Sequence, residues 1–218
     1  MATRPRRHTR AVRFGEVTVG GGAPVSIQSM STRPAASEEE TAAEIAALAR
    51  AGCEIVRVAV KAADDVGPFE RICAASPIPV VADVHFDHRL AVAAAEAGAA
   101  GLRINPGNIG SRGKVLAVLD AASAAGIPVR VGVNAGSIER DLRGLAAREP
   151  ARAMAESAFR HLEMIENAGF TDLVFSLKSS DALATIEANR IFALNNDCLL
   201  YTSPSPRDRT RSRMPSSA

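Results

Sequence analysis

Short runs of β-branched and other apolar residues recur along the chain from residue 25 onward, and an alanine-rich stretch with helical periodicity follows each of them. This alternation is typical of successive βα units on one parallel sheet. Six runs have the length of strands, at residues 25–30, 54–60, 79–86, 101–108, 128–134 and 172–178. We therefore expect an α/β fold with about six βα units.

The helical stretches carry start and stop signals. Ser37 and Glu40 have the spacing of a capping box ahead of the first helix, and Gly52 stands where a left-handed C-cap is expected. An Ala-Gly pair recurs at 51–52, 97–98, 125–126 and 168–169. Because a strand begins within a few residues each time, the βα unit is predicted to be an internal repeat.

Ahead of the first unit, residues 12–24 have the pattern of a small β-hairpin. Its glycine run, Gly20 to Gly22, could be taken for a phosphate loop. No helix opens directly after it, however, so we interpret the run as a plain turn.

Polar side chains fall on one face of nearly every predicted strand, close to its carboxyl end, because residues two apart in a strand point the same way. The residues concerned are Arg57, Asp83 with His85, Arg103 with Asn105, Arg130 with Asn134, and Ser176 with Lys178. An open sheet covered by helices on both faces would bury these charges at a cost of several kcal/mol each. In a barrel the same positions converge on the mouth. The pattern favours a TIM-type (β/α)8 barrel, truncated after about six βα units, with a short N-terminal hairpin.

Three arginines and one lysine make this mouth cationic: Arg57, Arg103, Arg130 and Lys178. Converging cations repel one another unless an anion lies between them, and a guanidinium matches phosphate oxygens in bidentate fashion. We therefore expect a diphosphate group as the ligand.

Asp83, His85 and Asp87 alternate in a way that could supply part of a divalent-metal site. No second cluster of metal ligands accompanies them. We prefer hydrogen bonds from these side chains to substrate hydroxyls, with a structural histidine as the second choice, and expect no metal site.

Five contiguous motifs together resemble the 4-hydroxy-3-methylbut-2-enyl diphosphate synthase family of the non-mevalonate isoprenoid pathway. The motifs occupy residues 81–91, 101–110, 129–142, 156–163 and 176–181, and the resemblance runs from about Arg10 to about Ala193. It implies an oxidoreductase whose barrel binds 2-C-methyl-D-erythritol 2,4-cyclodiphosphate and opens its ring reductively.

The resemblance also implies roles for single residues. Arg57, Arg103, Arg130 and Lys178 would hold the diphosphate, while Asp83, His85, Asn105 and Asn134 would line the cavity. In the intact enzyme of this family, a C-terminal domain carries a 4Fe-4S cluster, ferredoxin or flavodoxin supplies electrons, and the enzyme is a homodimer.

The three cysteines, Cys53, Cys73 and Cys198, lie far apart and form no C-x-x-C pair. A 4Fe-4S cluster needs about four ligands. We therefore expect the iron-sulfur domain to be absent, and this chain by itself to bind no cluster and to be inactive.

Charge is uneven along the chain, whose formal net charge is +2. Arginines crowd residues 1–10 and 202–218, so the body between them is acidic. We expect a basic flexible arm at 1–10, the incomplete barrel at 11–196, and a disordered tail at 197–218 that is non-native in character. The acidic body argues against nucleic acid as a partner. No signal region or membrane span is evident, so we expect a cytoplasmic protein.

Two other functions fit the residues. Lys178 on the last predicted strand could form a Schiff base if burial lowered its pKa, which would make the protein a lyase. The chain could also be a non-catalytic phosphate-binding fragment, and a pteridine-binding synthase barrel is a weaker possibility among enzymes.

Overall fold

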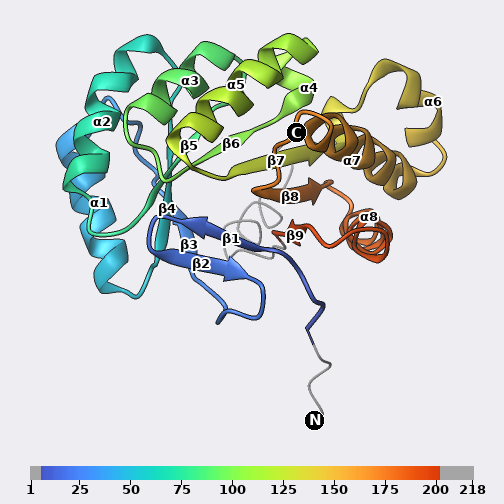
Figure 1. Cartoon of the computed structure of the whole chain (residues 1–218), viewed down its shortest axis with the longest axis horizontal. Coiled ribbons are helices and arrows are strands. Elements are labelled where there is room, and N and C mark those ends of the chain that lie inside the picture. Colours follow the sequence, from blue (N-terminus) through green and yellow to red (C-terminus); the bar gives the residue numbers. More distant parts are fainter. Residues whose placement is uncertain (1–5, 202–218) are drawn as a thin grey trace, which may run out of the picture.

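A curved parallel sheet of seven strands forms the centre of the computed structural model, which describes residues 6–201 (Figure 1). The strands lie side by side in chain order, and they are β3 (Gln28–Met30), β4 (Ile55–Ala59), β5 (Val80–Asp83), β6 (Gly101–Ile104), β7 (Val129–Asn134), β8 (Leu173–Lys178) and β9 (Leu199–Leu200). Each of the six predicted runs contains one of them, which confirms the α/β prediction. Within residues 6–201, β3 and β9 are the two edges of the sheet. The sheet is therefore curved like part of a barrel but does not close.

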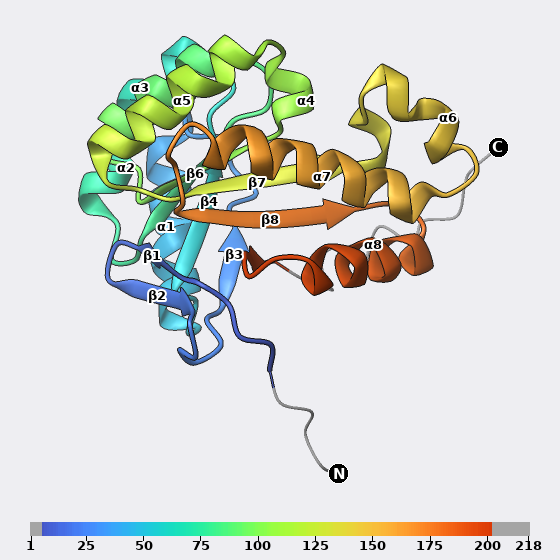
Figure 2. The same ribbon diagram turned by 45° about the vertical axis from the view of Figure 1, so that its right-hand side comes forward.

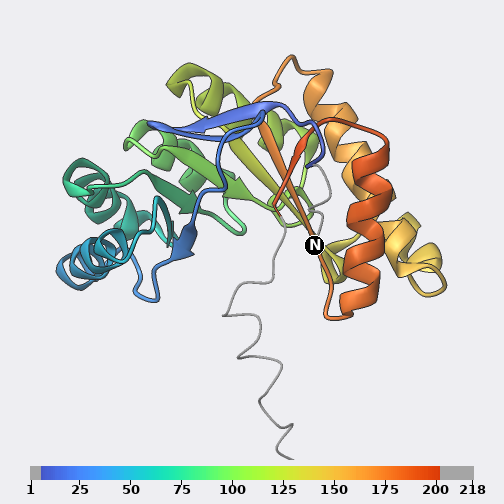
Figure 3. The ribbon, with the colours of Figure 1, turned by 90° about the horizontal axis from the view of Figure 1, so that it is seen from below.

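The helices follow the outer, convex side of the sheet (Figure 3). They are α1 (Glu38–Arg50), α2 (Val66–Ala75), α3 (His88–Glu96), α4 (Pro106–Ile109), α5 (Arg112–Ala125), α6 (Arg143–Ala146), α7 (Pro150–Glu166) and α8 (Ala182–Leu194). Three 3-10 turns lie at Ala63–Asp65, Ala135–Ser137 and Arg140–Leu142. No helix among residues 6–201 is long and apolar enough to cross a bilayer.

The main core lies between the sheet and these helices. Val58 and Val131 of the strands are fully buried there, together with Phe69 of α2 and Phe192 of α8. Figure 2 shows α7 and α8 alongside β7 and β8. Since each large apolar side chain buried in this way contributes roughly 1.5–3 kcal/mol, this layer fixes the positions of the strands.

The N-terminal hairpin, β1 (Ala11–Phe14) and β2 (Val17–Gly20), covers the inner face of the sheet at the amino ends of the strands. Val12 and Phe14 pack there against inward-facing residues of β4, β5 and β8. A Cβ on Gly101 would lie 2.7 Å from the Phe14 ring, so a glycine in β6 is required for this close approach. The predicted hairpin and the interpretation of its glycines as a turn are confirmed.

The predicted glycines at the carboxyl ends of the helices are confirmed, but the predicted capping box at the start of α1 is wrong. Gly52, Gly98, Gly126 and Gly169 all have positive φ, as the Ala-Gly repeat predicted. The side chain of Ser37, in contrast, makes no capping hydrogen bond. Acidic residues in the first turn of α1 favour that helix end through the helix dipole instead.

The expected boundary at residue 196 is wrong. Cys198 is buried, and β9 pairs with β8, so residues 197–201 belong to the folded body. The rest of the expected tail, 202–218, lies outside the described residues.

The second half of the N-terminal arm is attached to the same region. Arg10 forms ion pairs of 2.6 Å with Glu166 and with Asp197, and Arg7 donates to the carbonyl oxygen of Cys198. Residues 6–10 are therefore not a free solvated arm, and 1–5 lie outside the described residues.

Candidate functional site

The inner face of the sheet brings the three predicted arginines together. Arg103 lies near the carboxyl end of β6, but Arg130 is the second residue of β7, so its expected position close to the carboxyl end of a strand is wrong. In register, Asp83 of β5 stands beside Arg103 of β6, and Arg103 stands beside Arg130 of β7. Arg57 comes from β4, one strand further along. The alternation of side chains along each strand therefore predicted correctly which residues share this face.

Asp83 is the centre of one group of contacts. Its side chain is 3% exposed and lies 3.1 Å from Arg57 Nε and 3.2 Å from Arg103 Nη1. His85 Nε2 is 3.5 Å from the same carboxylate, and His85 Nδ1 is 3.4 Å from Arg103 Nη1. One carboxylate thus holds two guanidinium groups within the mouth.

Arg130 forms a second group without any carboxylate. It donates to Gln28 Oε1 at 3.3 Å and to Ser176 Oγ at 3.1 Å, and its guanidinium carbon lies 3.5 Å from the centre of the Tyr201 ring. Burial, followed by repulsion from Arg57, lowers the pKa of Arg130 to about 9. At neutral pH the group is still charged, and it is only 7% exposed.

The charges of this cluster do not balance. Arg57, Arg103 and Arg130 face a single carboxylate, while burial lowers the pKa of His85, so that this histidine is neutral near pH 7. Arg130 Nε is buried without a hydrogen-bond partner among residues 6–201, whereas Arg57 Nε has the ion pair with Asp83 but no hydrogen bond of good geometry. A buried donor without an acceptor is costly, so these residues carry an excess of positive charge that their own contacts do not neutralise.

Asn105 and Asn134 hold the loops after β6 and β7 together. Asn105 Nδ2 donates to Ser137 Oγ at 2.9 Å, and Asn105 Oδ1 accepts from the Gly107 N–H at 3.0 Å, which caps α4. Ser137 Oγ in turn donates to the carbonyl oxygen of Asn134 at 3.2 Å. The side chain of Asn105 and the backbone of Asn134 therefore join the two loops through Ser137.

Lys178 lies at the exposed carboxyl end of β8, beside Asn134 in the register. A Schiff-base lysine is activated by desolvation, and an exposed lysine lacks that condition. The position of Lys178 therefore does not favour the lyase alternative.

The sequence assigned no role to three residues that contact Arg130. Gln28 and Ser176 are its hydrogen-bond partners, and Tyr201 stacks against it. The sequence did place Ser176 on the same face as Lys178, although it did not indicate the contact with Arg130. The contact of Gln28 could not be predicted, because it joins β3 to a strand about 100 residues away.

The cysteines do not fit an iron-sulfur cluster. Cys53 and Cys198 are buried at separate places, and burial raises the pKa of Cys73 to about 12 and that of Cys198 to about 11. Cluster ligands are thiolates, which such pKa values disfavour. No three Cys, His, Asp or Glu side chains among residues 6–201 come together as metal ligands.

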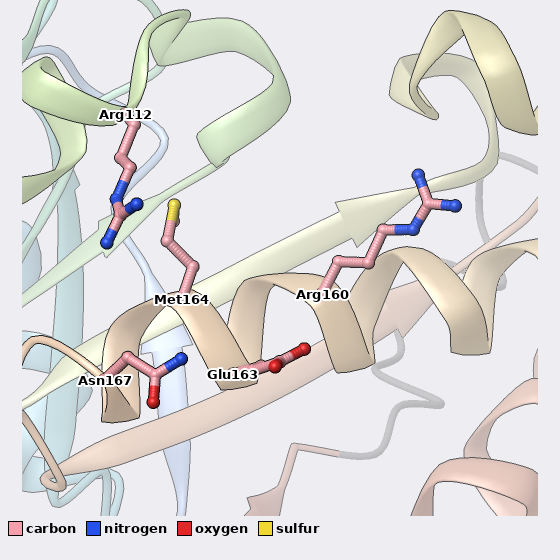
Figure 4. Close-up of a pocket in the computed structure, with 5 residues that line it drawn as sticks. All are labelled: Arg112, Arg160, Glu163, Met164 and Asn167. Atoms are coloured by element: carbon pink, nitrogen blue, oxygen red, sulfur yellow. The ribbon is translucent and has the colours of Figure 1, made fainter.

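A cavity of about 170 Å³ lies elsewhere, on the outer helices between α5 and α7 (Figure 4). Arg112, Arg160, Glu163, Met164 and Asn167 line it. Arg160 is already paired with Asp141 at 2.6 Å and with Glu156 at 3.2 Å. This cavity therefore shows none of the charge imbalance of the mouth.

The fold and the site define a protein of the TIM-barrel class with a cationic cluster on the inner face of its sheet. The sequence matches the family model of the GcpE TIM-barrel domain over residues 9–202. The chain belongs to this family.

Individual relatives carry the name of the enzyme family that the sequence motifs resemble. The chain is 45% identical over 189 residues to the 4-hydroxy-3-methylbut-2-en-1-yl diphosphate synthase (flavodoxin) of Natranaerobius thermophilus, covering 86% of this chain and 53% of the relative. It is 47% identical to the enzyme of that name from Nitratidesulfovibrio vulgaris, covering 90% of this chain and 51% of the relative. The chain thus spans about half the length of these relatives.

Solved structures resemble it in fold alone. The dihydropteroate synthase of Yersinia pestis superposes with a TM-score of 0.64 at 14% identity, covering 95% of this chain and 82% of that one. The 7,8-dihydropteroate synthase of Vibrio fischeri gives a TM-score of 0.61 at 11% identity, with coverage of 88% and 77%.

Proposed function

We propose that this chain is the substrate-binding part of a 4-hydroxy-3-methylbut-2-enyl diphosphate synthase, and that it holds 2-C-methyl-D-erythritol 2,4-cyclodiphosphate in its mouth. The names of the relatives support the reaction, which belongs to non-mevalonate isoprenoid biosynthesis. The observation that carries the proposal is the cluster of three buried or half-buried guanidinium groups, two of which share the carboxylate of Asp83 while the third, that of Arg130, has no carboxylate partner among residues 6–201.

The ligand's diphosphate fits the cations. Arg57, Arg103 and Arg130 would neutralise it, and Arg130 would gain the counter-charge that its buried position lacks. Lys178, at the rim, would meet the more exposed phosphate.

The ligand's carbon skeleton would meet the other predicted residues. Asp83 and His85 would accept or donate hydrogen bonds at its hydroxyl groups. Asn105 and Asn134 would close the rim over it, because Ser137 already links their loops.

The whole enzyme would need more than this chain. Reductive ring opening takes two electrons and releases water. A 4Fe-4S cluster supplies such electrons in the family that the sequence resembles, and the names of the relatives specify flavodoxin. Because the cysteines of this chain do not fit a cluster, we assign no electron-transfer step to its residues and expect the isolated chain to be inactive. Ferredoxin as an alternative donor, a homodimer of the intact enzyme and a cytoplasmic location belong to the same proposal.

Calorimetric titration with the cyclodiphosphate tests the proposal. We expect micromolar binding by the chain as it stands, and Arg103→Gln should weaken it by about tenfold or more, since a charge-assisted pair is lost. Arg152→Gln is the matched control, because Arg152 is exposed on α7 and pairs only with Glu149 among residues 6–201. Absence of binding, or an equal loss in both variants, would reject the proposal.

A further inference from the structure

Gly132 lies in the middle of β7, between Arg130 and Asn134 on the inner face of the sheet. Its φ lies outside the positive range that favours glycine, so the backbone does not require a glycine here. A glycine inside a strand weakens the strand, and it often marks a place where another group approaches the backbone closely. At Gly132 the group that approaches is a side chain of the neighbouring strand.

A Cβ built on Gly132 would lie too close to three atoms of one side chain, that of Arg103. It would lie 2.8 Å from Arg103 Nη2, 3.3 Å from Arg103 Cζ and 3.3 Å from Arg103 Nε. The space that a methyl group would fill is therefore taken up by the guanidinium group of Arg103.

Arg103 reaches this space from the neighbouring strand, β6. While Nη2 lies over Gly132 on one side, Nη1 lies 3.2 Å from Asp83 Oδ1 on the other. The guanidinium thus spans from β7 to β5 across its own strand, and its side chain is only 12% exposed. Asp83 fixes one end of this arginine, and the missing side chain of Gly132 leaves the space for the other end, so the guanidinium is pre-organised for an anion.

We propose that Gly132 is a positioning residue, which sets the place of the Arg103 guanidinium in the mouth by carrying no side chain. The consequence for anion binding rests on the function proposed above. The position of Arg103 itself does not depend on that function.

Two other glycines show that this arrangement is particular to Gly132. A Cβ on Gly101 would collide with the Phe14 ring, so that glycine serves the packing of the hairpin. A Cβ on Gly113, in α5, would meet nothing within 4 Å. Gly113→Ala is therefore a control with the same chemical change and no contact.

The first test is the affinity for inorganic diphosphate, measured by calorimetry on the whole chain. We expect Gly132→Ala to weaken binding about tenfold, as expected when a charge-assisted hydrogen bond is lost. The double variant of Gly132→Ala with Arg103→Ala should bind no more weakly than Arg103→Ala alone, because both changes remove the same contact. Wild-type affinity in Gly132→Ala, or losses that add in the double variant, would overturn the inference.

The second test needs no ligand. Burial is the main cause that lowers the pKa of His85. Asp83 raises this pKa, and Arg103, Arg57 and Lys61 lower it further. If Gly132→Ala displaces Arg103, the pKa of His85 followed by NMR should rise, as it should in Arg103→Ala, and stay unchanged in Gly113→Ala. An unchanged pKa in Gly132→Ala would overturn the inference.

The two tests separate the two proposals. If the wild-type chain does not bind diphosphate, the proposed function fails, and the titration of His85 alone decides whether Gly132 positions Arg103. If the wild type binds and Gly132→Ala binds equally well, the function stands and the inference fails. Circular dichroism should show the same fold in all variants, because the displaced atoms are the end of a flexible side chain.

Discussion

The inner face of the sheet carries two layers of side chains from the same strands, only two residues apart. In the lower layer, Ile55, Val81 and Val174 pack beneath the hairpin residues Val12 and Phe14. In the upper layer, the next inward positions on these strands are Arg57, Asp83 and Ser176. One layer is apolar and sealed, while the other is polar and leads to the mouth.

The difference shows that the same strands contribute both to the apolar packing and to the polar site, at successive inward positions along each strand. Burial of the lower layer stabilises the sheet. The upper layer places Arg130 at 7% exposure without a carboxylate, which costs stability in the absence of an anion. The two layers should therefore respond to substitution in opposite directions.

Removing Phe14 should have the largest effect. Phe14→Ala deletes a ring that is 4% exposed and leaves a cavity above Gly101, so we expect the free energy of unfolding to fall by about 3–5 kcal/mol. Urea denaturation followed by circular dichroism measures this. Phe86→Ala is the control, because Phe86 is 73% exposed and its loss should change stability by less than about 0.5 kcal/mol. Equal effects of the two substitutions would mean that the hairpin does not seal the lower layer.

An apolar substitution in the upper layer should increase the free energy of unfolding, in contrast to the loss expected for Phe14→Ala. Arg130→Met replaces a buried cation by an apolar side chain of similar length, and we expect the free energy of unfolding to rise by about 1–2 kcal/mol. Diphosphate binding should weaken at least about tenfold at the same time. Arg152→Met, on the exposed face of α7, should change neither quantity.

A loss of stability in Arg130→Met would contradict this comparison. It would mean that the hydrogen bonds to Gln28 and Ser176 and the stacking on Tyr201 already offset the burial of the charge.

The division into layers explains how much of the site the sequence could predict. Strand alternation is a local rule, so the sequence alone placed Arg57, Arg103 and Arg130 on one face. The structure confirms that these residues share one face. Their position along the strands did not follow from the rule, because Arg130 is the second residue of β7 and not close to its carboxyl end.

Contacts between distant segments were beyond the reach of that reasoning. Arg130 and Gln28 are far apart in the sequence, and Tyr201 lies in a stretch whose Ser, Pro and Arg content indicated no structure. The role of Gly132 was missed for a related reason. A glycine in a strand shows that a side chain is absent, but only coordinates show that Arg103 fills the space.

The smallest expected effect concerns pH and the upper layer alone. Burial lowers the pKa of His85 below its ordinary value of about 6.5, so the unfolded chain binds its proton more readily than the folded chain. The stability that neutral His85 contributes is full above about pH 6.5 and is lost as the pH falls through the folded pKa. Because His85 is 44% exposed, we expect this loss to be on the order of 1 °C in melting temperature between about pH 7.5 and 5.5.

Sulfate should reduce the loss of stability that His85 causes. Protonated His85 adds a cation beside Arg103, and sulfate, a dianion over this whole range, would neutralise it. Melting temperatures at both pH values, with and without sulfate, measure the effect. His85→Gln is the control for two reasons. Sulfate stabilises proteins generally, so it should raise the melting temperature of the wild type and of the variant. Burial also lowers the pKa of His161, which therefore contributes to the pH dependence of both. If sulfate reduces the acid-induced fall in melting temperature equally in the wild type and in His85→Gln, His85 does not share the anion site of the arginines.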